Sequence, residues 1–156
     1  EYPFEVIDCW FEAFKEFPND EFLVLTKRSE RMLEYFQTRY CPRNVWLGVS
    51  CGIVNAKERL NHLRKIDAKI HFVSFEPLLE DLGHLDLENI QWAIIGGESD
   101  YYNARLMRPE WAENIINQCR GRCAIWFKQV GGKGGDGAGG DVINGRKIQE
   151  YPNYRV

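Results

Sequence analysis

The stretch WAIIGGESDYYNARLMRPEW, residues 92–111, contains an apolar run, a polar loop and the start of a helix. The apolar run stops at Gly96 and Gly97, and Glu98 follows directly. Pro109 suits a first helical position, because its φ is already helical and its missing N–H has no partner to lose there. The stretch therefore predicts a strand–loop–helix unit with a carboxylate at the carboxyl end of the strand.

Similar apolar runs recur on both sides of this unit. We predict five strands, within EFLVLTKR (21–28), NVWLGVS (44–50), IHFVSFEPL (70–78), IQWAIIGGES (90–99) and AIWFKQVGG (124–132). The runs are almost continuously apolar, which is typical of parallel strands buried on both faces. Helical spacing between them predicts an α/β fold with right-handed crossovers. We expect an incomplete (β/α) barrel of mostly parallel strands.

Helical spacing of apolar residues predicts helices near 6–17, 29–36, 55–66 and 109–119. Ser29 is a candidate N-cap, and Asn55 with Glu58 resembles a capping box. After Gly131 the chain becomes glycine-rich, and Asn144-Gly145 predicts a small type I′ hairpin. We therefore divide the chain into a partial barrel, 1–132, and a loop-and-hairpin tail of the same domain, 133–156.

Composition and cysteine spacing exclude several classes of protein. The chain has 156 residues, a net charge of −3 and 44% hydrophobic residues, which suits one globular domain. No apolar run approaches the roughly 20 residues that cross a bilayer, so no membrane partner is expected. Five scattered cysteines predict reduced thiols in the cytoplasm rather than a disulfide framework. Their spacing, and that of the three histidines, predicts no metal site in this chain.

Every predicted strand ends in polar or charged residues. Since the carboxyl ends of parallel strands share one face, where active sites form, these residues are expected to converge. The candidates for binding a substrate or cofactor are Lys27, Arg28, Ser50, Glu76, Gly96, Gly97, Glu98, Lys128 and Gln129. No catalytic residue is assigned.

Two interpretations of Gly96-Gly97-Glu98 remain open. The glycines would let a ligand approach the backbone, and Glu98 would then offer a carboxylate to an ammonium, a hydroxyl or a ribose. Alternatively, the glycines serve a tight turn, and Glu98 pairs with Arg105 or Arg108. The glycine-rich segment GGKGGDGAGG is not a phosphate loop, because no Lys-Ser or Lys-Thr enters a helix after it.

The motifs FLVLTKRSERM, NVWLGVS, FVSFEPLL, WAIIGGES, RPEWAENIINQC and WFKQVGG resemble those of one family. It is the uncharacterised phage and prophage family of the gene-product-thirty-seven/sixty-eight type, a domain of unknown function. The resemblance runs from about Phe22 to Pro152. Members carry an N-terminal segment with three clustered cysteines, which resembles that of radical S-adenosylmethionine enzymes.

The resemblance implies the later part of such a barrel, without its cluster-binding cysteines. S-adenosylmethionine and an iron–sulfur cluster are then expected in a longer form, and this chain alone is not expected to be an active enzyme. Two other functions stay open. One is nucleic-acid binding through Lys27, Arg28 and the basic cluster within 57–69, and the other is a non-catalytic structural or interaction module.

The predicted strand at 22–26 has no strand before it, so we expect it at an open sheet edge. Four apolar residues are expected to be uncovered on the inner face there, namely Leu23, Leu25, Val45 and Leu47. Unpaired edges invite pairing with another chain. We therefore expect either self-association through this edge or a missing N-terminal segment that fills it.

Overall fold

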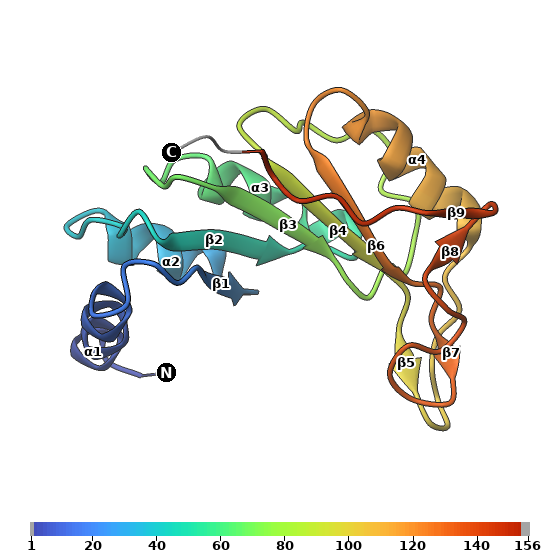
Figure 1. Cartoon of the computed structure of the whole chain (residues 1–156), viewed down its shortest axis with the longest axis horizontal. Coiled ribbons are helices and arrows are strands. Elements are labelled where there is room, and N and C mark those ends of the chain that lie inside the picture. Colours follow the sequence, from blue (N-terminus) through green and yellow to red (C-terminus); the bar gives the residue numbers. More distant parts are fainter. Residues whose placement is uncertain (1, 154–156) are drawn as a thin grey trace.

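A computed structural model describes residues 2–153 and contains a five-stranded parallel sheet (Figure 1). Its strands lie in chain order: β1 (Phe22–Thr26), β2 (Val45–Ser50), β3 (His71–Phe75), β4 (Trp92–Gly96) and β6 (Ala124–Gln129). Doubly wound folds reverse the strand order at a switch point, whereas barrels do not. The predicted α/β class is confirmed, and the sheet is consistent with an incomplete barrel.

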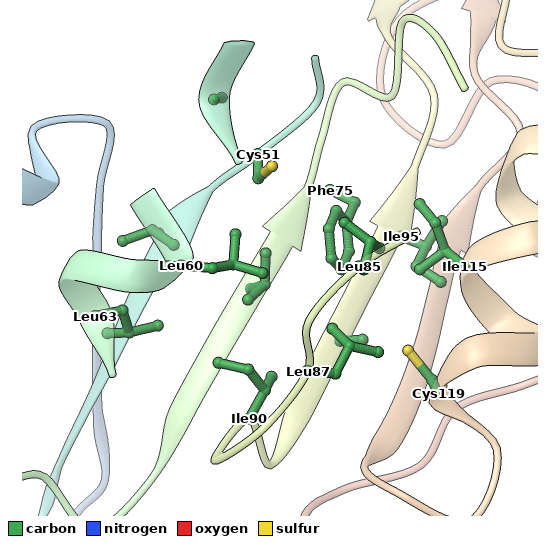
Figure 2. Close-up of a cluster of buried hydrophobic side chains, with 14 of the residues drawn as sticks. Cys51, Leu60, Leu63, Phe75, Leu85, Leu87, Ile90, Ile95, Ile115 and Cys119 are labelled. Atoms are coloured by element: carbon green, nitrogen blue, oxygen red, sulfur yellow. The ribbon is translucent and has the colours of Figure 1, made fainter. Parts of the chain in front are cut away.

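Helices cover one face of this sheet, which we call the outer face. The helical elements are α1 (Phe4–Lys15), α2 (Ser29–Phe36), the 3₁₀ turn η1 (Val54–Ala56), α3 (Glu58–Leu63) and α4 (Pro109–Cys119). Leu60 and Leu63 from α3 and Ile115 from α4 pack with Phe75 and Ile95 of the strands (Figure 2). This cluster is the main hydrophobic core, and it fixes the strand ends that carry the polar residues.

The inner face of the sheet carries a smaller aromatic cluster. Trp46, Phe72 and Trp92 are buried there, and Trp126 packs against them. Gly48 leaves room for the ring of Phe72, because a Cβ at Gly48 would overlap that ring. Aromatic side chains thus fill the amino-terminal half of the inner face.

The two edges of the sheet differ. At the β6 edge, Phe127 N–H donates to Ile148 O at 2.8 Å and Glu150 N–H donates to Ile125 O at 2.8 Å. At the other edge, no strand of residues 2–153 pairs with the free side of β1. The prediction that β1 lies at an open edge is therefore confirmed.

One part of the edge prediction is wrong. Leu23 lies beside Trp46 and Leu25 beside Gly48, so these two leucines are on the inner face and are about half exposed. Val45 and Leu47 alternate with those positions, because successive side chains of a strand point to opposite faces. They therefore lie on the outer face, where both are fully buried.

Both predicted helix caps are also wrong. Ser29 is the first helical residue of α2, and its hydroxyl contacts His62 Nδ1 at 2.9 Å. Asn55 lies inside η1, and α3 begins at Glu58 with no side-chain cap.

Two short strand pairs lie beyond the main sheet. β5 (Ser99–Asp100) pairs in parallel with β7 (Gly132–Lys133), and β8 (Val142–Ile143) pairs in antiparallel with β9 (Arg146–Lys147). Asn144 and Gly145 have φ of 47° and 72°, as a type I′ turn requires. The predicted C-terminal hairpin is confirmed. Of the predicted tail, residues 154–156 lie outside the described residues, as does residue 1 of the predicted barrel.

Candidate functional site

Glu76 lies at the carboxyl end of the inner face, directly after β3. Its Oε2 accepts a hydrogen bond from Ser74 Oγ at 3.2 Å, and its Oε1 lies 3.5 Å from Lys128 Nζ. The Glu76 side chain is 19% exposed and that of Lys128 is 53% exposed. The structure thus brings together an anion and a cation that were both predicted from strand ends, and leaves both in contact with solvent.

Ser50 and Arg59 support this arrangement from β2 and α3. Ser50 Oγ donates to the carbonyl oxygen of Glu76 at 3.1 Å, and Arg59 donates to the carbonyl oxygen of Ser50 at 2.6 Å. Ser50 is buried, so its hydroxyl holds the Glu76 backbone and does not face solvent. Ser50 is one of the predicted site residues, and it therefore holds Glu76 in position.

The two glycines after β4 make room for other parts of the chain. A Cβ added at Gly96 would lie 2.7 Å from Glu76 Oε1, so this glycine lets the carboxylate lie across the strand. A Cβ added at Gly97 would fall on the carbonyl oxygen of Val130. Close approach between chain segments therefore accounts for both glycines, without any need for a ligand.

Glu98 forms a bidentate ion pair with Arg105. Arg105 Nε and Nη2 lie 2.8 and 2.5 Å from the Glu98 carboxylate oxygens, and Arg105 N–H donates to Glu98 Oε2 at 2.9 Å. These contacts lower the pKa of Glu98 to about 2. Glu98 therefore pairs with Arg105, as one of the two interpretations of the sequence predicted.

Gln129 is buried at the end of β6 and joins three segments. Its Nε2 donates to Gly97 O at 3.1 Å and to Ser99 Oγ at 2.6 Å, while its Oε1 accepts from Gly137 N–H at 3.1 Å. The amide thus attaches the glycine-rich segment to the loop after β4. All of these contacts are within the protein. Gln129 therefore stabilises the segments around the site.

Lys27 and Arg28 line a pocket of about 320 Å³ between the start of α2 and the start of α3, and Glu76 is not part of its lining. Arg31 and Arg59 also line this pocket, as do Glu30, Glu58 and His62. The basic cluster predicted within 57–69 is largely engaged elsewhere. Lys57 donates to the carbonyl oxygens of Leu82 and His84, and Arg64 pairs with Asp86 at 2.6 Å.

The cysteines do not form a metal-binding group. All five are free thiols, and no three His, Cys, Asp or Glu within residues 2–153 are placed to hold a metal ion. Burial raises the pKa of Cys41 to about 12 and that of Cys51 to about 11, so both remain protonated near neutral pH. The described residues therefore do not fit an iron–sulfur cluster, which needs several thiolates together.

Residues 1–152 match the family DUF5131, whose description is a protein of unknown function. The chain belongs to this family. Searches of curated proteins and of solved structures found no match. The family thus covers nearly the whole chain and assigns no activity. Within residues 2–153, no helix is long and apolar enough to cross a membrane.

Sequence reasoning missed two residues of this region, Ser74 and Ser99. Ser74 lies on β3, two residues before Glu76, and the alternation of the strand continues to Glu76, so both side chains lie on the inner face. That spacing is a signal that could have identified Ser74. Ser99 contacts Gln129 across 30 positions of sequence, and no local pattern indicates that contact.

Proposed function

We propose that this DUF5131 chain forms the substrate- or cofactor-binding wall of a barrel enzyme that uses S-adenosylmethionine. The pairing of Glu76 with Lys128 carries the proposal. These groups lie side by side, 3.5 Å apart, at the carboxyl end of the inner face, which is where barrel enzymes bind their ligands. The sequence motifs resemble those of a family whose members carry a three-cysteine N-terminal segment like that of radical S-adenosylmethionine enzymes, and this resemblance supports the choice of ligand.

The chemistry of the pair suits the amino-acid end of that ligand. S-adenosylmethionine carries an ammonium and a carboxylate on one carbon, and a carboxylate beside an ammonium is complementary to both. One ion pair leaves donors available on Lys128, because a lysine ammonium has three. Ser74 holds the Glu76 carboxylate in place, so the site is partly ordered before a ligand arrives.

The residues of this chain do not fit an iron–sulfur cluster. We propose that any cluster is ligated by cysteines other than the five of this sequence. We also propose a cytoplasmic location, because five unpaired thiols suit a reducing compartment.

Calorimetric titration of the chain with S-adenosylmethionine tests the proposal. We expect saturable binding, at least tenfold weaker in both Glu76→Gln and Lys128→Gln. Glu34→Gln, an exposed change on α2, is the matched control and should bind as the unchanged chain does. Adenosine, which lacks the amino-acid end, should bind more weakly and be insensitive to both variants. Absence of S-adenosylmethionine binding at millimolar concentration would contradict the proposal.

Nucleic-acid binding remains a second candidate because of the cationic pocket around Lys27 and Arg59. Phosphate contacts make such binding fall steeply with salt. Fluorescence anisotropy with labelled single-stranded DNA at two salt concentrations decides this candidate. Binding that weakens with salt and is lost in Lys27→Gln supports it, and salt-independent or absent binding rejects it.

A further inference from the structure

The turn after α4 brings Cys119 and Cys123 together. Helix α4 ends at Cys119, where Arg120 has φ −55° and ψ 125° and Gly121 has φ 71°. These angles are those of a type II turn, whose third residue needs a positive φ and is therefore commonly glycine. The N–H groups of Arg122 and Cys123 both donate to the carbonyl oxygen of Cys119, at 2.9 and 3.1 Å. The chain thus reverses tightly and returns Cys123 to the side of Cys119.

The two thiols share a hydrogen bond and differ in burial. Cys119 is completely buried in the main hydrophobic core at the end of α4 (Figure 2), whereas Cys123 is partly exposed. The Cys119 thiol donates to Cys123 Sγ, and this bond raises the pKa of Cys119 and lowers the pKa of Cys123. Cys123 is therefore the member of the pair that ionises first, and the thiolate is the nucleophilic form of cysteine.

Cys123 lines an open pocket of about 640 Å³. Gln91 and Ala124, which also line it, place the pocket at the amino-terminal ends of β4 and β6. Two charged residues complete its polar lining. The charge of Arg122 lowers the pKa of Cys123, and that of Glu150, whose Oε2 accepts a hydrogen bond from the N–H of Ile125, raises it. The pocket thus gives a small molecule access to the Cys123 sulfur beside a guanidinium group.

The other three cysteines do not combine these features. Cys41 and Cys51 are buried, and burial holds their pKa values at about 12 and about 11. Cys9 is exposed on α1, and its thiol donates to the carbonyl oxygen of Glu5 at 3.3 Å. Cys119 and Cys123 instead pair an accessible thiol with a buried thiol in contact with it. An accessible thiol beside a second, resolving thiol is the arrangement that forms an internal disulfide.

We propose that Cys119 and Cys123 form a redox-active dithiol site, which is oxidised by a small disulfide whose carboxylates bind Arg122. The Cys123 thiolate attacks one sulfur of that disulfide, so that a mixed disulfide forms and one thiolate leaves. Cys119 then attacks the Cys123 sulfur, and the second thiolate leaves. Two electrons pass to the small disulfide, and the two protons of the dithiol reach the two released thiols through solvent.

The surroundings of the pair favour this oxidant. A guanidinium group binds carboxylates well, because its donors match the two carboxylate oxygens. The pocket is also much larger than a peroxide molecule needs. Glu76 lies at the carboxyl end of the sheet, whereas this pocket lies at the amino-terminal end, so the inference does not depend on the ligand proposed for Glu76.

Reaction of the full chain with oxidised glutathione, which carries carboxylates, tests the proposal. The reaction is quenched with acid at timed intervals and mapped by trypsin and mass spectrometry. Cleavage after Arg120 and Arg122 separates the two cysteines, so an internal disulfide joins two peptides. We expect that disulfide in the unchanged chain, and a mixed disulfide on Cys123 in Cys119→Ser. In the folded chain, Cys123 should react about tenfold faster than the exposed Cys9, and urea should abolish this difference.

Arg122→Gln tests the binding of carboxylates. Cystamine is a small disulfide that carries ammonium groups in their place. The ratio of the rates with oxidised glutathione and with cystamine cancels any change in the thiolate fraction of Cys123. This ratio should fall about fivefold in Arg122→Gln, because an exposed charge contributes modestly and is screened by salt. Arg120→Gln is the matched control, since Arg120 is exposed in the same turn and is not part of the pocket lining.

The unchanged chain decides the proposal even where Cys119→Ser, a change in the core, fails to fold. Retention of both thiols under conditions that modify Cys9 would overturn it, as would equal rates at Cys9 and Cys123 in the folded chain. A mixed disulfide that forms first on Cys119 would reverse the assigned roles and overturn it too. An unchanged ratio of rates in Arg122→Gln would refute the binding of the small disulfide beside Arg122.

Discussion

Glu76 and Glu98 follow neighbouring strands, and their partners give them different roles. Glu98 is held by three hydrogen bonds from Arg105, so its charge is neutralised within one loop. Glu76 has a single hydroxyl donor and a more distant ammonium, and it lies over a glycine. The partner side chains, more than the residue type, therefore decide which of the two carboxylates is available to bind a ligand.

Arg105→Gln should return the pKa of Glu98 from about 2 towards its ordinary value of 4.5, because the dominant cause of the lowering is the Arg105 side chain. A depressed carboxyl pKa stabilises the fold above the unfolded pKa, and the benefit is lost as pH falls through the folded pKa. The stability difference between the two proteins should therefore be full above pH 4.5 and vanish near pH 2.

NMR titration of the Glu98 side-chain carboxyl measures this pKa directly. Arg108→Gln is the control, because Arg108 lies over the Trp111 ring and makes no bond to Glu98. An unchanged Glu98 pKa in Arg105→Gln would show that the ion pair does not form in solution.

Gly97→Ala should destabilise the protein by about 2–3 kcal/mol, because the new Cβ meets the backbone carbonyl of Val130, which cannot move aside as a flexible side chain can. Gly83→Ala is the comparison. Its site has φ +60° but open space, so it should cost only about 1 kcal/mol. Urea unfolding of the two variants gives both values, and an equal loss in each would refute the close approach at Gly97.

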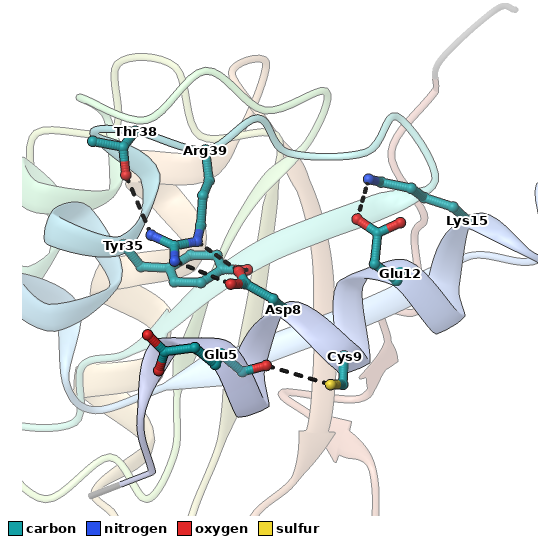
Figure 3. Close-up of polar contacts among 8 residues, drawn as sticks. All are labelled: Glu5, Asp8, Cys9, Glu12, Lys15, Tyr35, Thr38 and Arg39. Carbon is teal, nitrogen blue, oxygen red and sulfur yellow. Dashed lines mark hydrogen bonds and ion pairs between the residues drawn. The ribbon is translucent and has the colours of Figure 1, made fainter.

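Among the elements, α1 is attached to the rest of the chain chiefly through α2 and the first residue of β1. Phe11 packs against Tyr35 and Phe36 with ring centroids 5.4 Å away in each case, and Asp8 binds Arg39 (Figure 3). Ile7, Trp10 and Phe14 of this helix line an open groove beside β1. An element held along one side only is expected to open locally more often than the central strands.

Arg39→Ala should loosen α1 selectively, because it removes both guanidinium bonds to Asp8 and the contacts of that guanidinium with the Phe4 and Tyr35 rings. Hydrogen exchange should become several-fold faster in residues 4–15 and stay unchanged in β3. Lys15→Ala is the matched control, because Lys15 pairs only with the exposed Glu12 on the same helix. Faster exchange across the whole sheet would indicate global destabilisation instead.

Across the whole molecule, the two faces of the sheet contribute unequally to stability. The outer face is closed by helices and by the connection between β3 and β4, and Phe75 is completely buried there. The inner face is filled by aromatic rings at its amino-terminal half, and at the β1 edge it is uncovered. Stability therefore resides mainly on the outer face.

Phe75→Ala should cost about 3–5 kcal/mol of unfolding free energy, because it leaves a cavity in a closed core. Leu25→Ala should cost less than about 1 kcal/mol, because half of that side chain is already in solvent. Urea denaturation monitored by tryptophan fluorescence compares the two. Similar losses in both variants would mean that the β1 edge is covered in solution.

The sequence by itself determined the strands, their parallel pairing, the hairpin at Asn144-Gly145 and the helix start at Pro109, because these depend on local conformational preference and on the period of apolar residues. It also placed Glu76 and Lys128 at strand ends on one face of the sheet. Contacts between distant residues were decided only by the tertiary structure. The burial of Val45 and Leu47 beneath the helices, the hydroxyl of Ser29 on His62, the close packing of Gly97 against Val130 and the groove beside β1 all depend on how separate segments meet, and no local pattern encodes those distances.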